Sequence, residues 1–346
     1  MTRPIGYYVH HHGDGHRQRA LAIAAGYPQR FVMLGTNLAG RTGDVRAIDL
    51  PDDRMPNAQA FDGIDGTESR PDALHYAPLD HDGVRARMGL MSHWIANNKP
   101  ALIVVDVSVE IAMLARLCAT PVAFIRLSGR RDDAAHCEAY RGASLLIAPF
   151  AARLDDMSLP QWIRDKTIYC PGIVAAPSQS IAPVSRRVLV VAGKGGAPLE
   201  GNLIAAAAIA TPQYDWRVIG PATRPDQCPD NLQCVGWVEN ATAEIAAAQI
   251  VVGAAGDGLV NAVIAMEKPF VCLPEPRPFD EQIQKAHALA SAGAAIVCED
   301  WPAPDRWPLI LDDAKQLDRK SLHTLGDPDG AAKTMALLEA LADRQK

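Results

Sequence analysis

A histidine in a glycine-rich turn is the first candidate for chemistry. The segment His12-Gly13-Asp14-Gly15-His16 follows an apolar run and precedes a helical pattern at residues 16–25. Glycines there let a ligand approach the backbone closely, and a helix start favours an anion or a developing negative charge. A neutral His16 at this point can take a proton from a hydroxyl group or from water. The alternative is a helix-capping loop with an incidental histidine, and position alone does not decide between the two.

The histidines before this helix also raise the question of a metal site. His10, His11, His12 and His16 lie close together in the chain, with Asp14 among them. On a strand, His10 and His12 would point to one side and His11 to the other. The helical and CxxC-type spacings of zinc sites are absent. Polar strand ends that line a cleft are the better explanation, and we predict no metal.

Asp106 is a second candidate because it ends the apolar run at residues 101–106. The carboxyl ends of parallel strands share one edge of a sheet, so Asp106 would lie near His16. It could accept a hydrogen bond from His16 and fix the tautomer of the imidazole. It could instead cap the following helix, which the residues alone favour slightly.

Two glycine-rich loops in the second half of the chain are candidates for binding phosphate. Gly193-Lys194-Gly195-Gly196 follows an apolar run, but it lacks the Walker spacing and its serine or threonine. Residues 253–262 contain three glycines and lead directly into a helix, whose first amides would form an anion site. Further on, Asp280-Glu281-Gln282 opens another helix and could bind the vicinal hydroxyls of a sugar. An ordinary charged helix start is the better explanation of that run when it is taken alone.

Short β-branched runs alternate with alanine- and leucine-rich helical patterns along the whole chain. The runs lie at residues 5–10, 30–34, 101–106, 121–126, 145–148, 187–192, 216–219, 249–253, 269–273 and 294–297. They are apolar on both faces, as buried parallel strands are. The alternation predicts an α/β fold with doubly wound parallel sheets.

Two interruptions of this alternation suggest the domain organisation. Residues 49–82, rich in Asp, Gly and Pro, are expected to form long loops, and residues 171–183 have the composition of a linker. Each half then begins with a strand and a glycine-containing loop. We predict two Rossmann-like domains with a cleft between them: residues 1–172, a linker at 173–186, residues 187–327, and a C-terminal helix at 328–346 that can pack back on the first domain.

Together, these features resemble a GT-B glycosyltransferase of the family 28 type, the group of the peptidoglycan N-acetylglucosaminyltransferase and the diacylglycerol galactosyltransferases. Gly13-Asp14-Gly15-His16 matches the family's opening loop, and the second half matches most closely over about residues 187–298. By this resemblance, Trp237 and Val238 belong to the segment that contacts the uracil. The nucleotide- and donor-binding residues expected from the motifs are Gly15, Gly193, Lys194, Gly195, Trp237, Val238, Gly256, Asp257, Gly258, Asn261, Glu281 and Gln282.

The resemblance implies transfer of a sugar from a nucleotide sugar, usually UDP-linked, to an acceptor hydroxyl, with no metal and no further cofactor. His16 and Asp106 would be the catalytic residues, and helix N-termini would stabilise the leaving diphosphate. The GHxxR pattern of Gly15–Arg19 also recurs in a related UDP-sugar hydrolase of the pseudaminic acid pathway. Hydrolysis on the same fold therefore stays open.

One position departs from the family pattern. The family places a ribose-binding glutamate seven residues before the Gly-x-Pro proline, and counting back from Pro269 gives Ala262. Glu267 also stands where the family has glycine. A charge-assisted hydrogen bond to ribose is worth about 1.5–3 kcal/mol. Another group replaces this contact, or donor choice differs, or the protein is a non-catalytic nucleotide-binding relative.

The composition argues against several other classes. The chain has 346 residues, 48% of them hydrophobic, which suffices for two packed domains. Its 34 basic and 40 acidic residues give a net charge of −6, with no basic surface for nucleic acid. No run reaches the roughly 18–20 apolar residues of a membrane span, although peripheral membrane contact stays open. Seven scattered cysteines and the lack of a signal sequence suggest buried thiols in a cytoplasmic protein. The acceptor stays unidentified.

Overall fold

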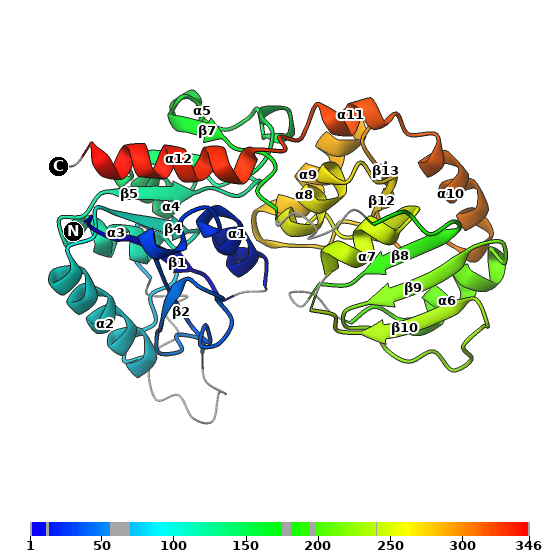
Figure 1. Cartoon of the computed structure of the whole chain (residues 1–346), viewed down its shortest axis with the longest axis horizontal. Coiled ribbons are helices and arrows are strands. Elements are labelled where there is room, and N and C mark those ends of the chain that lie inside the picture. Colours follow the sequence, from blue (N-terminus) through cyan, green and yellow to red (C-terminus); the bar gives the residue numbers. More distant parts are fainter. Residues whose placement is uncertain are drawn as a thin grey trace.

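The computed structural model describes residues 2–11, 14–55, 70–174, 181–193, 198–239 and 241–344. Two parallel α/β domains lie beside each other, and each has its own sheet (Figure 1). This confirms the predicted architecture of two doubly wound, Rossmann-like domains.

The first domain is built on a seven-stranded parallel sheet in the order β3-β2-β1-β4-β5-β6-β7. Its strands are β1 (Ile5–Val9), β2 (Phe31–Gly35), β3 (Arg46–Asp49), β4 (Leu102–Asp106), β5 (Val122–Ile125), β6 (Leu145–Ala148) and β7 (Thr167–Tyr169). Its helices are α1 (Gly15–Ala24), α2 (Asp82–Asn98), α3 (Val109–Leu117), α4 (Ala134–Gly142) and α5 (Gln161–Lys166), with short 3₁₀ turns η1 (Pro28–Arg30) and η2 (Ala152–Leu154).

The second domain has a six-stranded parallel sheet in the order β10-β9-β8-β11-β12-β13. Its strands are β8 (Arg187–Val191), β9 (Asp215–Ile219), β10 (Leu232–Gly236), β11 (Ile250–Gly253), β12 (Phe270–Cys272) and β13 (Ile296–Val297). Its helices are α6 (Gly201–Ala210), α7 (Ala241–Ala247), α8 (Asp257–Ala265), α9 (Glu281–Ser291), α10 (Trp307–Lys315) and α11 (Arg319–His323), with 3₁₀ turns η3 (Pro278–Asp280) and η4 (Pro304–Arg306). A last helix, α12 (Gly330–Asp343), follows.

Each sheet separates two apolar clusters, because its central strands are buried on both faces. In β1, Tyr7 and Val9 belong to one cluster and Tyr8 to the other. Successive side chains of a strand point to opposite faces, so a strand covered by helices on both sides must be apolar throughout. This is why the central strands were visible as continuous apolar runs.

The chain crosses between the domains at two places that touch each other. A Cβ atom on Gly172 would lie 1.9 Å from the carbonyl oxygen of Asp327, and one on Gly330 would lie 1.8 Å from that of Pro171. Only glycine therefore lets the two crossing segments pass so closely. Beyond the second crossing, α12 packs on α1 and β4, and Leu338 is buried in the first domain's core (Figure 1).

Three strands were not predicted, and all three lie at sheet edges. Strands β3 and β7 end the first sheet, and β10 ends the second. Edge strands such as Arg46–Asp49 and Leu232–Gly236 keep exposed residues, so they lack a continuous apolar run. Within the expected loop region, residues 50–55 and 70–81 form neither helix nor strand, as predicted.

The cysteine prediction is partly wrong. All seven thiols are free, but only Cys137, Cys170 and Cys272 are buried, whereas Cys228 and Cys234 are exposed. Within the described part of the chain, no helix is long and apolar enough to cross a membrane.

Candidate active site

A cavity of about 860 Å³ lies between the domains, at the point where both sheets reverse their strand order. In the first sheet β1 and β4 are neighbours, and in the second β8 and β11 are neighbours. Open parallel sheets bind ligands at the carboxyl ends of the strands beside such a reversal. The residues that follow these four strands are therefore the natural walls of a substrate site.

On the first domain's wall, His16 and Asp106 are in contact. His16 lies in the first turn of α1, shortly after β1, and Asp106 ends β4. The Nδ1 atom of His16 lies 2.9 Å from Oδ1 of Asp106. An ionised carboxylate only accepts, so we assign the proton of the neutral imidazole to Nδ1. This leaves Nε2 as a proton acceptor on a histidine that lines the cavity.

Asp106 is fully buried and ionised. Its carboxylate also accepts hydrogen bonds from Nη1 of Arg19 at 2.8 Å and from the Tyr7 hydroxyl at 3.2 Å. Burial alone would raise the pKa of Asp106, but Arg19 and then His16 hold it below its ordinary value. The capping interpretation is wrong, because the Ser108 side chain accepts the amide hydrogen of Ile111 and caps α3.

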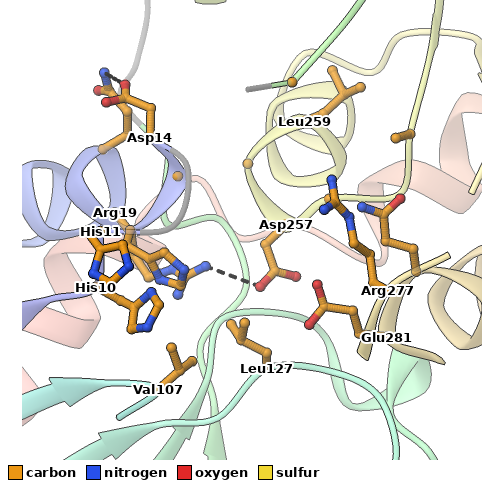
Figure 2. Close-up of a pocket in the computed structure, with 18 of the residues that line it drawn as sticks. His10, His11, Asp14, Arg19, Val107, Leu127, Asp257, Leu259, Arg277 and Glu281 are labelled. Carbon is orange, nitrogen blue, oxygen red and sulfur yellow. Dashed lines mark hydrogen bonds and ion pairs between the residues drawn. The ribbon is translucent and has the colours of Figure 1, made fainter. Parts of the chain in front are cut away.

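Arg19 extends this network across the cleft. It lies one turn after His16 on α1, and its Nη2 donates to Oδ2 of Asp257 in the second domain at 3.1 Å (Figure 2). Asp257 also pairs with Nζ of Lys285 on α9. Sequence reasoning missed both cations. The three-residue spacing of His16 and Arg19, which places them on one helix face, was the available signal for Arg19.

On the second domain's wall, α8 presents its N-terminus to the cavity. Gly256 is its N-cap, and no side chain of the described residues caps this end. A Cβ atom on Gly256 or Gly258 would meet nothing within 4 Å, so the backbone here borders open space. Uncapped amides and the helix dipole together suit an anion. Gly193, just after β8, also lines the cavity, whereas Lys194 and Gly195 lie outside the described residues.

The Asp257 carboxylate is engaged within the protein. Burial would raise its pKa, but Lys285 and then Arg19 lower it, so the side chain is ionised and paired. The group that Asp257 can offer to a diphosphate is therefore its backbone amide, in the first turn of α8.

Asn261 and Gln282 line the cavity but use their amide groups to hold the backbone. Nδ2 of Asn261 donates to the carbonyl oxygens of Pro149 and Asp257, each at 3.0 Å. Oε1 of Gln282 accepts from the amides of Ala255 at 3.1 Å and Glu275 at 2.9 Å. Both side chains thus position the loops around α8.

Glu281 lines the cavity and contacts the first domain. Its Oε2 accepts from Nη2 of Arg131 at 2.5 Å, and the same guanidinium lies 4.5 Å from the centre of the Phe279 ring. A Cβ atom on Gly129 would lie 2.5 Å from the Phe279 carbonyl oxygen, so this approach requires glycine. Sequence reasoning gave no signal for Arg131, because the contact joins residues 150 positions apart.

Trp237 and Val238 follow β10 and line the cavity on the second domain's side. The Trp237 side chain is 45% exposed, which leaves its ring accessible from the cavity. Glu239 lines the same wall and was not predicted.

The position of the missing glutamate also lies on this wall. Ala262 is buried on α8 and borders the cavity. Glu267 is not among the lining residues, and its side chain faces His323, with Oε1 at 3.3 Å from Nδ1. Glu267 therefore does not supply the carboxylate that the resemblance predicts at this wall. Its backbone is left-handed, with a φ of 50°, a conformation that favours glycine.

The neighbouring histidines form a ring cluster in the first domain. His10 stacks on His11 at 4.7 Å and meets His16 edge-on at 5.5 Å, and Nδ1 of His11 lies 3.1 Å from Asp53. Burial, followed by His16, lowers the pKa of His10 to about 3, so this ring is neutral at pH 7. Within the described ranges, no group of three or more His, Cys, Asp or Glu side chains is arranged to hold a metal.

Comparison with known proteins agrees with this geometry. Residues 221–307 match the family model described as glycosyltransferase family 28 C-terminal domain. This segment therefore resembles the C-terminal domain of family 28 glycosyltransferases. Glycosyltransferases also share the fold. This chain superposes on the kitacinnamycin glycotransferase with a TM-score of 0.69, 13% identity and coverage of 98% and 99% of the two chains. MurG of Acinetobacter baumannii gives 0.61, with 16% identity and coverage of 97% and 99%.

A curated relative of this chain is the UDP-N-acetylglucosamine--N-acetylmuramyl-(pentapeptide) pyrophosphoryl-undecaprenol N-acetylglucosamine transferase of Clavibacter sepedonicus. The two are 30% identical over 169 residues, which is 45% of this chain and 46% of the relative. The match thus spans less than half of that relative's length. Together with the fold, these similarities confirm the resemblance to GT-B glycosyltransferases of family 28.

Proposed function

We propose that this protein transfers a sugar from a UDP-linked donor to an acceptor hydroxyl, with His16 as the general base. One observation carries the proposal: a single cavity has the His16–Asp106 pair on one wall and the uncapped N-terminus of α8 on the other. A base for the nucleophile and an anion site for the leaving group are the two parts that glycosyl transfer needs. The donor named for the relative, a UDP-sugar, supports the choice of nucleotide.

In the proposed reaction, the donor diphosphate binds at the first amides of α8. The acceptor hydroxyl donates its hydrogen bond to Nε2 of His16. As its oxygen attacks the anomeric carbon, the proton passes to Nε2 and the bond between that carbon and the diphosphate oxygen breaks. Asp106 accepts the Nδ1–H hydrogen bond throughout, which orients the ring and stabilises the imidazolium.

The charges around this site suit a leaving diphosphate. Asp106 and Asp257 are balanced by Arg19 and Lys285, so the buried network carries no excess negative charge toward the donor. The helix amides are fixed before the reaction and need no reorganisation as charge develops on the diphosphate. We propose that these groups, and no metal, stabilise the leaving group, since the cavity's paired carboxylates Asp53 and Asp257 are held by histidine, arginine or lysine side chains.

The lining of the cavity favours transfer over hydrolysis. Besides His16, the first domain contributes Val84 and Met88 of α2 and Ile111 of α3 to the cavity wall. A water nucleophile needs no such space, whereas an acceptor molecule does. A non-catalytic role is the alternative that Ala262 keeps open.

A thermal-shift panel of nucleotides, followed by a turnover assay, tests the proposal. UDP should raise the melting temperature more than ADP or GDP do, because a ligand that binds only the native state stabilises it. Mass spectrometry of reactions with UDP-sugars should then show sugar attached to an acceptor. UDP release without acceptor would support the hydrolase, and binding without any release would support the non-catalytic role.

A further inference from the structure

The first-domain half of the cavity has an apolar part beside its histidines and its paired charged groups. Six apolar side chains, from a loop, from α2 and from the segments after β4 and β5, form this part: Met55, Val84, Met88, Val107, Ile111 and Leu127. Val84 and Met88 are one turn apart on α2 and present one face of that helix. None of the six can hydrogen-bond through its side chain apart from the weakly accepting sulfur of methionine.

The carboxylates in this half are already occupied by the protein itself. Asp53 is 3.1 Å from Nδ1 of His11 and 3.0 Å from Nη2 of the buried Arg87. Oε1 of Glu110 accepts the amide hydrogens of His75 at 2.6 Å and Tyr76 at 2.7 Å. A cationic substrate would have to break these contacts to find a partner.

The cations that border the cavity are occupied as well. The described lining residues include four arginines, and each of them forms an ion pair with a carboxylate. Arg19 pairs with Asp106 and Asp257, Arg54 with Asp52, Arg131 with Glu281, and Arg277 with Glu275. Burial, followed by Arg131, lowers the pKa of His136 to about 4, and His10 is neutral as well. The described residues 49–55 and 70–82, which supply part of this wall, include six acidic and two basic residues.

An anionic substrate would therefore be buried here without a compensating charge, which is costly. We propose that this half of the cavity takes an uncharged, largely apolar acceptor that carries the reacting hydroxyl. This inference rests on the proposed function. It separates this chain from the Clavibacter sepedonicus relative, which by its name acts on a pyrophosphoryl-undecaprenol.

Two fluorescent probes that differ only in charge test this proposal. N-phenyl-1-naphthylamine is uncharged, and 8-anilino-1-naphthalenesulfonate has the same rings with an added sulfonate. Titration of the full-length protein should give a dissociation constant about tenfold lower for the uncharged probe, because the sulfonate would be buried unpaired. Equal or tighter binding of the sulfonate, or no binding of either probe, would overturn the proposal.

Variants locate the binding in this half of the cavity. Met88→Lys should weaken the uncharged probe and strengthen the sulfonate, thereby reversing the preference. Met55→Lys provides a second test at a half-exposed position, in case Met88→Lys does not fold. Met157→Lys, at a position that is 72% exposed and outside the cavity, should behave like the native protein. An unchanged preference in both cavity variants would contradict the assignment.

Calorimetric titration with UDP keeps this result separate from the proposed function. UDP binding should be similar in the native protein and in Met88→Lys, because Met88 belongs to the wall opposite α8. Absence of UDP binding with an intact probe preference would refute the glycosyltransferase proposal but not the apolar subsite. UDP binding together with a preference for the sulfonate probe would refute the apolar subsite but not the glycosyltransferase proposal.

Discussion

Arg19 of the first domain and Asp257 of the second form a buried ion pair, with Nη2 and Oδ2 separated by 3.1 Å. Arg19 also holds Asp106, the carboxylate that contacts His16, and Asp257 opens the helix whose N-terminus borders the cavity. One guanidinium thus connects the proposed base to the proposed diphosphate site. The Arg19 side chain is therefore held by a carboxylate from each domain, Asp106 of the first and Asp257 of the second.

We expect Arg19→Met to destabilise the protein by about 3 kcal/mol, the low end of the cost of removing one partner from a buried ion pair. The low end applies because neither carboxylate would be left without a partner: Asp106 would still contact His16, and Asp257 would still pair with Lys285. Chemical denaturation measures this change. Arg85→Met, which breaks an exposed pair with Asp80 and Asp82, is the control and should change the free energy of unfolding by less than about 0.5 kcal/mol.

Arg19→Lys separates positioning from stability. A lysine keeps the charge but cannot bridge both carboxylates as a planar guanidinium does. Asp106 would then be held less precisely against His16, so kcat should fall in Arg19→Lys even where the protein stays folded. A variant with lower stability and unchanged kcat would restrict Arg19 to a structural role.

His16→Ala should reduce turnover by about 100- to 10,000-fold, the usual contribution of a general base. UDP affinity, measured by calorimetry, should stay nearly unchanged because the nucleotide is expected on the second domain. His93→Ala, on the exposed surface of α2, is the matched control. Full activity in a folded His16→Ala protein would rule out the base role.

Ala262→Glu tests whether the ribose contact is missing. Glutamate costs little helix propensity relative to alanine, and a well-placed charged hydrogen bond contributes about 1.5 kcal/mol, or roughly tenfold in the dissociation constant for UDP. Ala265→Glu places the same charge on the exposed side of α8 and should not alter UDP binding. Weaker binding in Ala262→Glu would show that another group already occupies this space, and unchanged binding that residue 262 does not face the ribose.

His136 should make the protein less stable in acid. Its pKa is about 4 in the folded protein, because of burial and Arg131, against an ordinary value of 6.5. Between these values the unfolded chain binds more protons, so this contribution is complete above pH 6.5 and is lost as the pH falls toward 4. The loss amounts to about 3 kcal/mol.

Urea denaturation at pH 7, 5.5 and 4 measures this dependence. His136→Gln should flatten the curve relative to the native protein, whereas His93→Gln, at an exposed position, should leave it unchanged. His10 adds to the acid sensitivity of both proteins, so the difference between them isolates His136. Parallel curves for native protein and His136→Gln would contradict the prediction.

The sequence by itself determined the two-domain α/β fold and the loops that face the cleft. Central strands such as Leu102–Asp106 are covered on both faces, so nearly every position must be apolar. Such a strand therefore appears in the sequence as a continuous apolar run. Glycine-rich turns after strands, such as those before His16 and α8, are equally local features. Edge strands such as Leu232–Gly236 leave no such signal, because four of the five residues of this strand are exposed.

Only the tertiary structure decided which polar groups meet. Asp106 could cap a helix or orient a histidine, and the answer came from the neighbouring position of β1 and β4. Arg131 meets Glu281 from another domain, and Glu267 lies near His323 instead of lining the cavity as Ala262 does. Charged groups pair with those that lie close in space. The packing of the two domains brings together residues that are far apart in the sequence, and no periodic pattern in the sequence shows which ones will meet.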